Sequence, residues 1–148
     1  MRVVLQRVEE AAVAVGGRKT AAIKNGLLLL VGFGREDTAR TAEAMAQKIV
    51  KLRVFEDDEG KMNLALADAG GEVLSVPQFT LLGRMEKGNR PGFDAAARAE
   101  EAKELWAGFN DTLRSGGVIV AEGVFGAHMK VSLVNDGPVT FVLDSSEV

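Results

Sequence analysis

The sequence predicts a mixed α/β domain that is rich in β-strand and has two helices packed against the strands. Short apolar runs of Val, Ile and Leu alternate with clusters of turn-forming residues in the first 33 residues and again near the C-terminus. Two longer segments repeat apolar residues at helical spacing. A chain of 148 residues buries a sizeable core, so we expect one domain over residues 1–148.

The N-terminal strands come first in the chain. A long strand is expected over residues 2–15, with an irregularity near Glu9-Glu10. Gly16-Gly17 then predicts a turn into a second strand over residues 19–23. Asn25-Gly26 is a strong hairpin motif and predicts a third antiparallel strand.

That third strand, residues 27–33, begins with Leu27–Val31, which is apolar without alternation. Such a run is typical of a central strand buried on both faces. Further strands are expected over residues 54–55, 64–67, 72–82 and 118–121, followed by a closing hairpin over residues 131–143.

Two helices are expected between these strands. The first covers residues 38–52, with Asp37 as its N-cap, and the second runs from Asp94 to Arg114. Trp106 lies on the apolar face of the second helix, so we expect it in the core.

Composition excludes several kinds of site. There is no cysteine, so disulfides and zinc–thiolate sites are ruled out, and the single histidine, His128, rules out an all-imidazole metal site in one chain. The acidic turn at residues 57–60 lacks the further ligands of a calcium loop and is expected to be a solvated turn. We therefore predict no metal and no cofactor.

The same composition bears on partners and location. The net charge of −3 argues against broad nonspecific binding to nucleic acid but permits a local basic patch. Leu27–Val31, the longest apolar run, is too short to span a bilayer. No signal peptide is predicted at the N-terminus, so we expect no membrane partner and a cytoplasmic protein.

Three stretches carry candidate chemistry. Pro77 interrupts a strand, and period-two spacing would put Gln78 and Thr80 on one face of it. Residues 84–93 hold three cations in a loop rich in Gly and Pro, which suits either phosphate contacts or a plain solvated loop. These three cations are Arg84, Lys87 and Arg90.

The third stretch is Asn135-Asp136-Gly137-Pro138, which reads as a tight turn, and an X-Pro bond in such a turn is sometimes cis. A Ser/His/Asp triad would have to use His128 with Ser132 or Thr80. Nothing around either hydroxyl matches the nucleophile elbow, so we disfavour the triad.

The ordered set of motifs resembles one family over essentially the whole chain. The set consists of Leu5-Gln6-Arg7-Val8, Gly60-Lys61-Met62-Asn63-Leu64, Gln78-Phe79-Thr80-Leu81, Arg90-Pro91 and Asn135-Asp136-Gly137-Pro138-Val139-Thr140. In this order they closely resemble the D-aminoacyl-tRNA deacylases. The resemblance implies β/β/α layers, a homodimer with its active site at the subunit interface, and hydrolysis of the ester that joins a D-amino acid or glycine to the 3′ end of tRNA, including glycyl-tRNA mischarged on tRNA-Ala.

The resemblance also implies residue roles. Gln78, Phe79 and Thr80 would line the catalytic pocket. A cis Gly137-Pro138 pair would enter the partner's pocket and exclude L-amino acids, with Arg7 holding its orientation. Met129 is assigned to the same substrate pocket.

Two features leave alternatives open. Pro77 stands where the family usually has Ser, and a related branch that edits mischarged L-alanyl-tRNA has Pro there, whereas Phe79 and the Asn-x-Gly-Pro pattern favour the D-specific branch. A non-catalytic dimer that binds tRNA ends is a further alternative. Thr80 is either a nucleophile or a residue that positions water with help from the ribose 2′-hydroxyl. We favour the second role because no identifiable base would deprotonate it.

Overall fold

The computed structural model describes residues 1–86 and 88–148. In this part of the chain the elements follow in the order β1 (Arg2–Val15), β2 (Arg18–Ile23), β3 (Gly26–Gly32), α1 (Ala39–Lys51), β4 (Phe55–Glu56), β5 (Met62–Leu64), β6 (Glu72–Pro77), the 3-10 helix η1 (Phe79–Leu82), α2 (Ala99–Ser115), β7 (Ile119–Glu122), β8 (Lys130–Asp144) and the 3-10 helix η2 (Ser145–Glu147). Neither α1 nor α2, the two α-helices described, has the length and apolar character that a membrane crossing requires.

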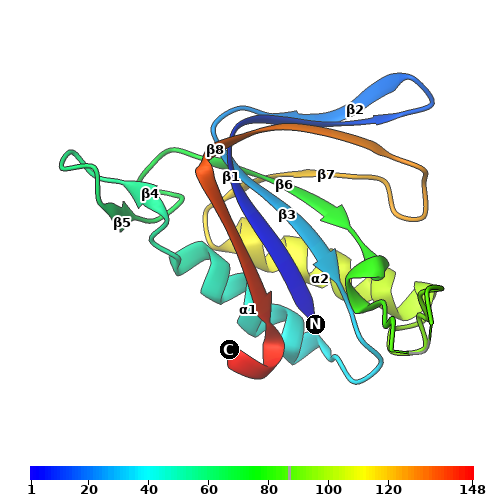
Figure 1. The fold of residues 1–148 in the computed structure, drawn as a ribbon. Coiled ribbons are helices and arrows are strands. Elements are labelled where there is room, and N and C mark those ends of the chain that lie inside the picture. Colours follow the sequence, from blue (N-terminus) through cyan, green and yellow to red (C-terminus); the bar gives the residue numbers. More distant parts are fainter. Residues whose placement is uncertain (87) are drawn as a thin grey trace.

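The main sheet is strongly curled, and the helices cover one side of it. Its strand order is β2-β1-β3-β6-β7, and β8 pairs with β1. Figure 1 shows β1 rising from the N-terminus and then bending across the top of the molecule beside β2 and the first half of β8. This upper layer lies over β3, β6 and β7, and the helices lie below them. The predicted β/β/α layers and two packing helices are therefore confirmed.

Each pair of layers encloses an apolar core. Val8, Val13 and Leu74 belong to the core between the two strand layers. Leu29 and Trp106 belong to the core between the sheet and the helices, which confirms both the buried central strand and the core position of Trp106. Burial of large apolar side chains on both sides makes β3 the centre of the fold.

The Asn25-Gly26 pair is not a hairpin turn, which corrects the prediction for the N-terminal strands. β2 and β3 pair with β1 in one continuous antiparallel register, from Val13↔Ala21 to Arg2↔Gly32. They therefore lie end to end along one edge of β1 and do not pair with each other. The break at residues 24–25 faces the predicted irregularity at Glu9-Glu10. A glycine is needed here because β6 approaches closely: a Cβ on Gly26 would lie 1.9 Å from the Glu72 carbonyl oxygen.

This close approach predicts that Gly26→Ala destabilises the fold by about 3 kcal/mol or more, because the two backbones must separate. Gly108→Ala is the matched control: Gly108 lies in α2 with no atom within 4 Å of the added methyl group. We expect that variant to be more stable by about 0.5–1 kcal/mol. Urea denaturation of both variants provides the test, and near wild-type stability of Gly26→Ala would contradict the tight packing of β3 on β6.

The helix starts differ from the prediction. Thr38, not Asp37, caps α1, and its Oγ1 accepts a hydrogen bond from the Thr41 N–H at 3.3 Å. The Asp37 carboxylate is engaged elsewhere, by the Gly34 N–H at 2.6 Å and the Met1 amino group at 2.7 Å. The second helix begins at Ala99 rather than Asp94. Hydrogen bonds from the Ala97 N–H to the Phe33 carbonyl and from the Arg35 N–H to the Ala95 carbonyl hold the preceding residues against the end of β3.

Candidate active site

The Asn135–Pro138 segment is not a hairpin turn, which corrects the second turn prediction. β8 is one strand of 15 residues that pairs with β1 on both sides of this segment, at Gln6↔Thr140 and Glu10↔Val134. Residues 135–139 of β8 therefore lie opposite residues 7–9 of β1. The extra residues form a bulge that carries Gly137 and Pro138 out of the ladder.

Hydrogen bonds and an ion pair to Arg7 hold the bulge in place. The Asn135 side chain donates hydrogen bonds to the carbonyls of Arg7 at 2.9 Å and Val139 at 3.0 Å. The Arg7 Nε donates to the Asp136 carbonyl and lies 3.1 Å from the Asp136 carboxylate. Because the Arg7 side chain is only 4% exposed, its charge requires these partners and holds them in place.

Gly137 and Pro138 are exposed at the tip of the bulge, and the peptide bond between them is cis. Gly137 has φ +131°, a conformation that L-residues rarely adopt. The same Arg7 side chain donates to the Val54 carbonyl at 2.9 Å and lies 3.3 Å from Glu56 Oε1 in β4. The bulge therefore exposes the backbone atoms of Gly137 and Pro138 to solvent, while the contacts of Arg7 hold it in place.

The second part of the site lies at the end of β6. Gln78 and Thr80 do not share a strand face, because β6 ends at Pro77 and Phe79–Leu82 form η1. The physical reason is that β7 pairs with β6 only as far as Ser75, so Pro77 lies beyond the ladder on that side. The two side chains nevertheless meet, and the Gln78 amide donates a hydrogen bond to Thr80 Oγ1.

The start of η1 offers two backbone donors. Within the described residues, the Phe79 and Thr80 N–H groups donate no backbone hydrogen bond and have no side-chain cap, as is usual at the beginning of a helix. The Phe79 ring is 57% exposed and packs edge-on against Phe93, with ring centroids 5.0 Å apart. An acyl oxygen placed before η1 would meet both donors.

Arg2 fixes the position of η1. Its Nη1 donates to the Leu81 carbonyl at 3.0 Å, and its Nη2 lies 3.1 Å from Asp144 at the end of β8. The pKa of Asp144 lies below its usual value because the Ser146 backbone N–H donates to the carboxylate, and Arg2 adds to the effect. Sequence analysis did not single out Arg2, since its partners lie 79 and 142 residues away.

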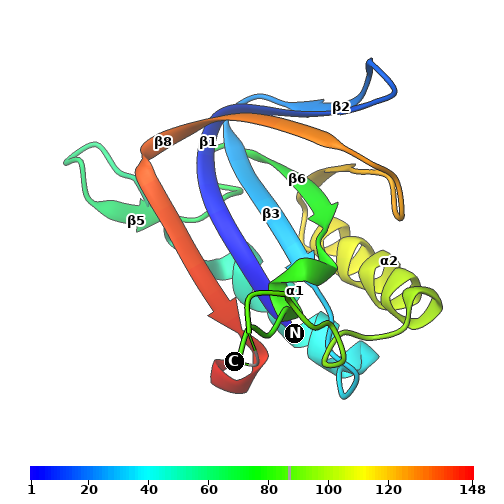
Figure 2. The same cartoon turned by 45° about the vertical axis from the view of Figure 1, so that its right-hand side comes forward.

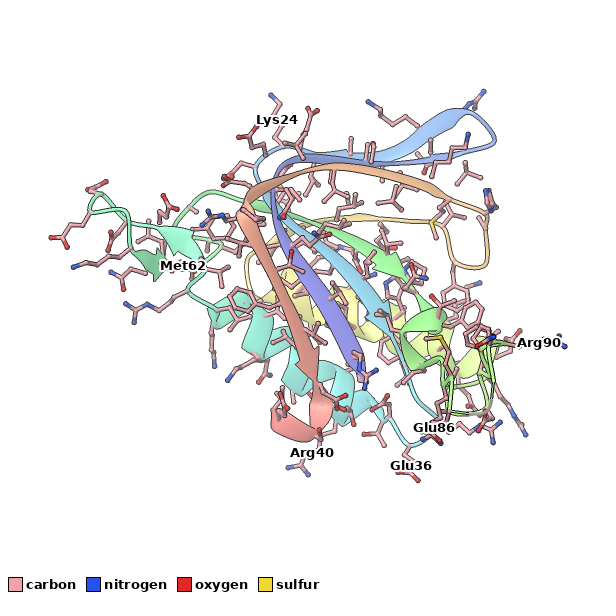
Figure 3. The ribbon with its side chains drawn as sticks, in the orientation of Figure 1. Lys24, Glu36, Arg40, Met62, Glu86 and Arg90 are labelled. Atoms are coloured by element: carbon pink, nitrogen blue, oxygen red, sulfur yellow. The ribbon has the colours of Figure 1, made fainter. Side chains whose placement is uncertain are left out.

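The basic loop begins directly after η1. The Gly83 N–H donates to the Thr80 carbonyl at 3.0 Å, and Arg84 and Gly92 exchange backbone hydrogen bonds of 2.9 and 2.8 Å. Arg84 and Arg90 are exposed, and Figure 3 shows Arg90 pointing away from the ribbon. Lys87, the third predicted cation, lies outside the described residues.

One chain does not bring the two parts of the site together. Val8, next to the bulge, pairs with Gly26, whereas Pro77, next to η1, pairs with Val31. The five residue steps of β3 from Gly26 to Val31 span about 16 Å at roughly 3.3 Å per residue. Figures 1 and 2 both show the bend of β8 on the opposite side of the molecule from η1.

Met129 belongs with the η1 side of the molecule. Its Sδ and the Pro77 Cδ both lie within 3.5 Å of the position that a Cβ on Gly123 would occupy.

His128 is exposed, and within the described part of the chain it hydrogen-bonds to neither Ser132 nor Thr80, so the triad is not formed. No three His, Asp or Glu side chains among the described residues gather closely enough to hold a metal ion.

The acidic turn is held by its own backbone. Asp57 accepts hydrogen bonds from the Lys61 and Glu59 N–H groups, each at 3.0 Å. These bonds, that of Lys61 above all, lower the pKa of Asp57.

Comparison with known proteins identifies the family of the chain. A family model described as "D-Tyr-tRNA(Tyr) deacylase" matches residues 4–144. The D-aminoacyl-tRNA deacylase of Thermus aquaticus is 56% identical over 147 residues, which are 99% of this chain and 97% of that protein. The enzyme of that name from Geotalea daltonii is 53% identical over 145 residues, covering 98% of this chain and 97% of its own.

Two solved structures share the fold. One, described as a c-Myc DNA unwinding element binding protein, superposes with a TM-score of 0.90 at 42% identity, over 97% of this chain and 98% of that one. Another, described as a probable eukaryotic D-amino acid tRNA deacylase, has a TM-score of 0.81 at 18% identity, over 96% of this chain and 97% of that one, and shows a likeness of fold alone. The family model and the relatives at 53% and 56% identity place this chain among proteins that act on aminoacyl-tRNA. It belongs to the D-Tyr-tRNA(Tyr) deacylase family.

Proposed function

We propose that this protein works as a homodimer in which η1 of one protomer and the Gly137-Pro138 tip of its partner form each active site. As a member of its family the chain is a D-aminoacyl-tRNA deacylase, a hydrolase that acts on aminoacyl-tRNA. The single observation that carries the shared site is the separation of about 16 Å between η1 and the bulge along β3. Two parts of one pocket that cannot meet within a chain meet when a second copy supplies the missing part. We place the protein in the cytoplasm, where tRNA substrates are used.

The outer part of β8 supports this assembly. Phe141 and Val142, in the half of β8 that follows the bulge, are 39% and 61% exposed. Within the described residues β8 pairs only with β1, so its other edge is free. A free edge beside exposed apolar side chains is stabilised when another protein surface covers it.

The chemistry proposed for the site is electrostatic. An aminoacyl ester is activated, so a polarised carbonyl and a positioned water are sufficient for hydrolysis. The N–H groups of Phe79 and Thr80 would stabilise the oxyanion, and the Gln78–Thr80 pair would orient water or substrate. The ribose 2′-hydroxyl at the 3′ end of the tRNA would assist departure of the 3′ oxygen.

The substrate range follows from the tip of the bulge. Backbone atoms of Gly137 and Pro138 would exclude an L side chain from the α-carbon, whereas glycine has no side chain to exclude. We therefore include glycyl-tRNA mischarged on tRNA-Ala among the substrates.

Two other functions make different predictions. A deacylase that edits mischarged L-alanyl-tRNA, the alternative that Pro77 leaves open, would cleave the L ester. A binding module would protect the ester; one structural relative is described as a DNA unwinding element binding protein. Incubation of D- and L-aminoacyl-tRNA in excess over protein separates all three, because only the proposed function consumes several equivalents of the D ester and spares the L ester.

The loop cations make a further prediction about the 3′ end of the tRNA. Arg84 and Arg90 are exposed within nine residues of η1, so we expect each to contact a phosphate. Arg84→Ala/Arg90→Ala should reduce the slope of log Kd against log salt by about 1.4, or roughly 0.7 per contact on single-stranded RNA. Arg40→Ala/Lys48→Ala, which removes the same charge from α1, is the control. An unchanged slope in the loop variant would place the RNA elsewhere.

A further inference from the structure

Three cations gather where the β1–β2 hairpin meets the start of β8. In the strand register Lys19 of β2 and Lys130 of β8 both lie directly opposite Ala14 of β1, one on each side. Residues opposite one another point to the same face, so the two lysines share a face about 10 Å apart, two strand spacings. Arg18 precedes Lys19 beside the hairpin turn, so it lies at the same corner but projects from the opposite face of β2. We call Arg18, Lys19 and Lys130 the hairpin cations.

These cations are available to a ligand. All three are exposed, and Ala14 between the lysines is half-buried while its neighbour Val13 points into the core. Among the residues that the structure describes, no carboxylate lies within ion-pair distance of any of them. In a chain with a net charge of −3, three unpaired cations on one corner form a local positive patch.

The hairpin cations lie on the same side of the molecule as η1. Lys130 follows Met129, whose Sδ lies 3.0 Å from the Cβ position of Gly123, and Pro77 Cδ lies 3.5 Å from that same position. Figures 1 and 2 show the hairpin tip, the loop between β7 and β8, and η1 with the loop after it in succession along one side. A substrate bound at η1 can therefore extend past the hairpin cations.

A groove beside Lys19 shows what shape would fit there. It has a volume of about 300 Å³, and its lining includes the small residues Ala12, Ala22 and Ser132, with Glu10 among the other lining residues. Small side chains let an extended backbone approach the sheet. Flexible lysine stems carry point charges that reach phosphates without a fixed geometry.

We propose that the hairpin cations bind phosphates of the tRNA acceptor stem while its 3′ end occupies the site at η1. The inference rests on the proposed placement of the active site at η1. It assigns the sequence-independent part of tRNA binding to the β1–β2 hairpin and the start of β8, in addition to the loop after η1. The contact acts on the RNA backbone, so it raises affinity for any tRNA and adds to the salt dependence of binding.

The test uses Lys19→Ala/Lys130→Ala, with Arg40→Ala/Lys48→Ala as a control of equal charge. Arg40 lies on α1, far from the hairpin in Figure 3. Each protein is given D-tyrosyl-tRNA and, separately, the D-tyrosyl ester of adenosine, which has no acceptor stem. Binding of uncharged tRNA is measured from about 50 to about 200 mM salt. Affinity that depends on phosphate contacts falls steeply over this range.

For the hairpin variant we expect KM on tRNA to rise roughly tenfold with kcat unchanged, as two exposed ionic contacts are lost. The salt slope should fall by about 2, close to one per contact. Cleavage of the adenosine ester should be unaffected. The control variant should show none of these changes.

Three results would overturn the inference: an unchanged salt slope, a rise in KM equal to that of the control, or equal loss on the adenosine ester. Failure of the proposed hydrolysis of D esters is seen separately, because the wild-type protein would then cleave neither substrate. Wild-type turnover of D-tyrosyl-tRNA together with a hairpin variant that matches the control would overturn the inference alone.

Discussion

The wild-type protein is expected to cleave D-aminoacyl-tRNA and glycyl-tRNA and to spare the matched L-aminoacyl-tRNA by at least about 100-fold in kcat/KM, close to 3 kcal/mol. The reason is geometric. The exposed tip at Gly137 and Pro138 consists largely of backbone, and the buried Arg7 and the Asn135 amide hold it from below. Backbone atoms cannot swing aside as a long side chain can. They therefore block the direction in which the side chain of an L-amino acid would leave the α-carbon of the substrate. Comparable rates on D and L esters would contradict this filter.

Gly137→Ala tests which residue forms the filter. At φ +131° an added Cβ is strained, and it would lie 2.6 Å from Val139 Cγ2. The tip must therefore shift, and we expect the preference for the D ester to fall at least about tenfold. Gly70→Ala is the matched control, because Gly70 has φ +62° with no atom within 4 Å of the added methyl group. Equal loss of preference in both variants would point to general destabilisation.

The second large effect is expected from a change in the substrate, removal of the terminal 2′-hydroxyl, and not from the substitution of Thr80. Thr80→Val should keep its single-turnover rate within about tenfold of wild type, whereas a substrate that lacks the terminal 2′-hydroxyl should react about 100-fold more slowly or worse. Among the described residues, the side chain bonded to Thr80 Oγ1 is the Gln78 amide, which is a donor and not a base. A threonine without a base is a poor nucleophile.

The control for this experiment is binding of uncharged tRNA, which Thr80→Val must bind with wild-type affinity. An inactive Thr80→Val that still binds tRNA, combined with rapid cleavage of the deoxy substrate, would make Thr80 the nucleophile. Such a result would also require a base that the described geometry does not supply.

Local sequence patterns were sufficient to predict most elements of the fold. The long first strand, the buried run at Leu27–Val31, the apolar faces of both helices and the core position of Trp106 were all predictable, because strand and helix periodicity report which face is buried. The helix starts were less predictable. Asp37 has good capping chemistry, but its carboxylate is taken by the Gly34 N–H and the Met1 amino group.

The two turn motifs show where local pattern fails. Asn25-Gly26 and Asn135–Pro138 are both strong turn formers, and both bend the chain, yet neither reverses it. Turn residues specify local φ and ψ, whereas the direction of the next strand depends on which edge it can pair with. β1 is long enough to pair with β2, β3 and both halves of β8, so both bends became interruptions within long ladders.

Sequence patterns alone were enough to predict the β-rich α/β class, the two apolar helix faces and, through the ordered motifs, the family to which the chain belongs. Folding in three dimensions was needed to make Gly137 and Pro138 the tip of a bulge anchored by Arg7, and to let Arg2 hold η1 from the far end of the chain. The strand register also places the two parts of the site far apart within one chain. The physical reason is that these features depend on residues far apart in the sequence, such as Arg2 and Leu81, 79 positions apart, and Arg7 and Asp136, 129 positions apart. Strand pairing and burial bring such residues together, and no local spacing reports them.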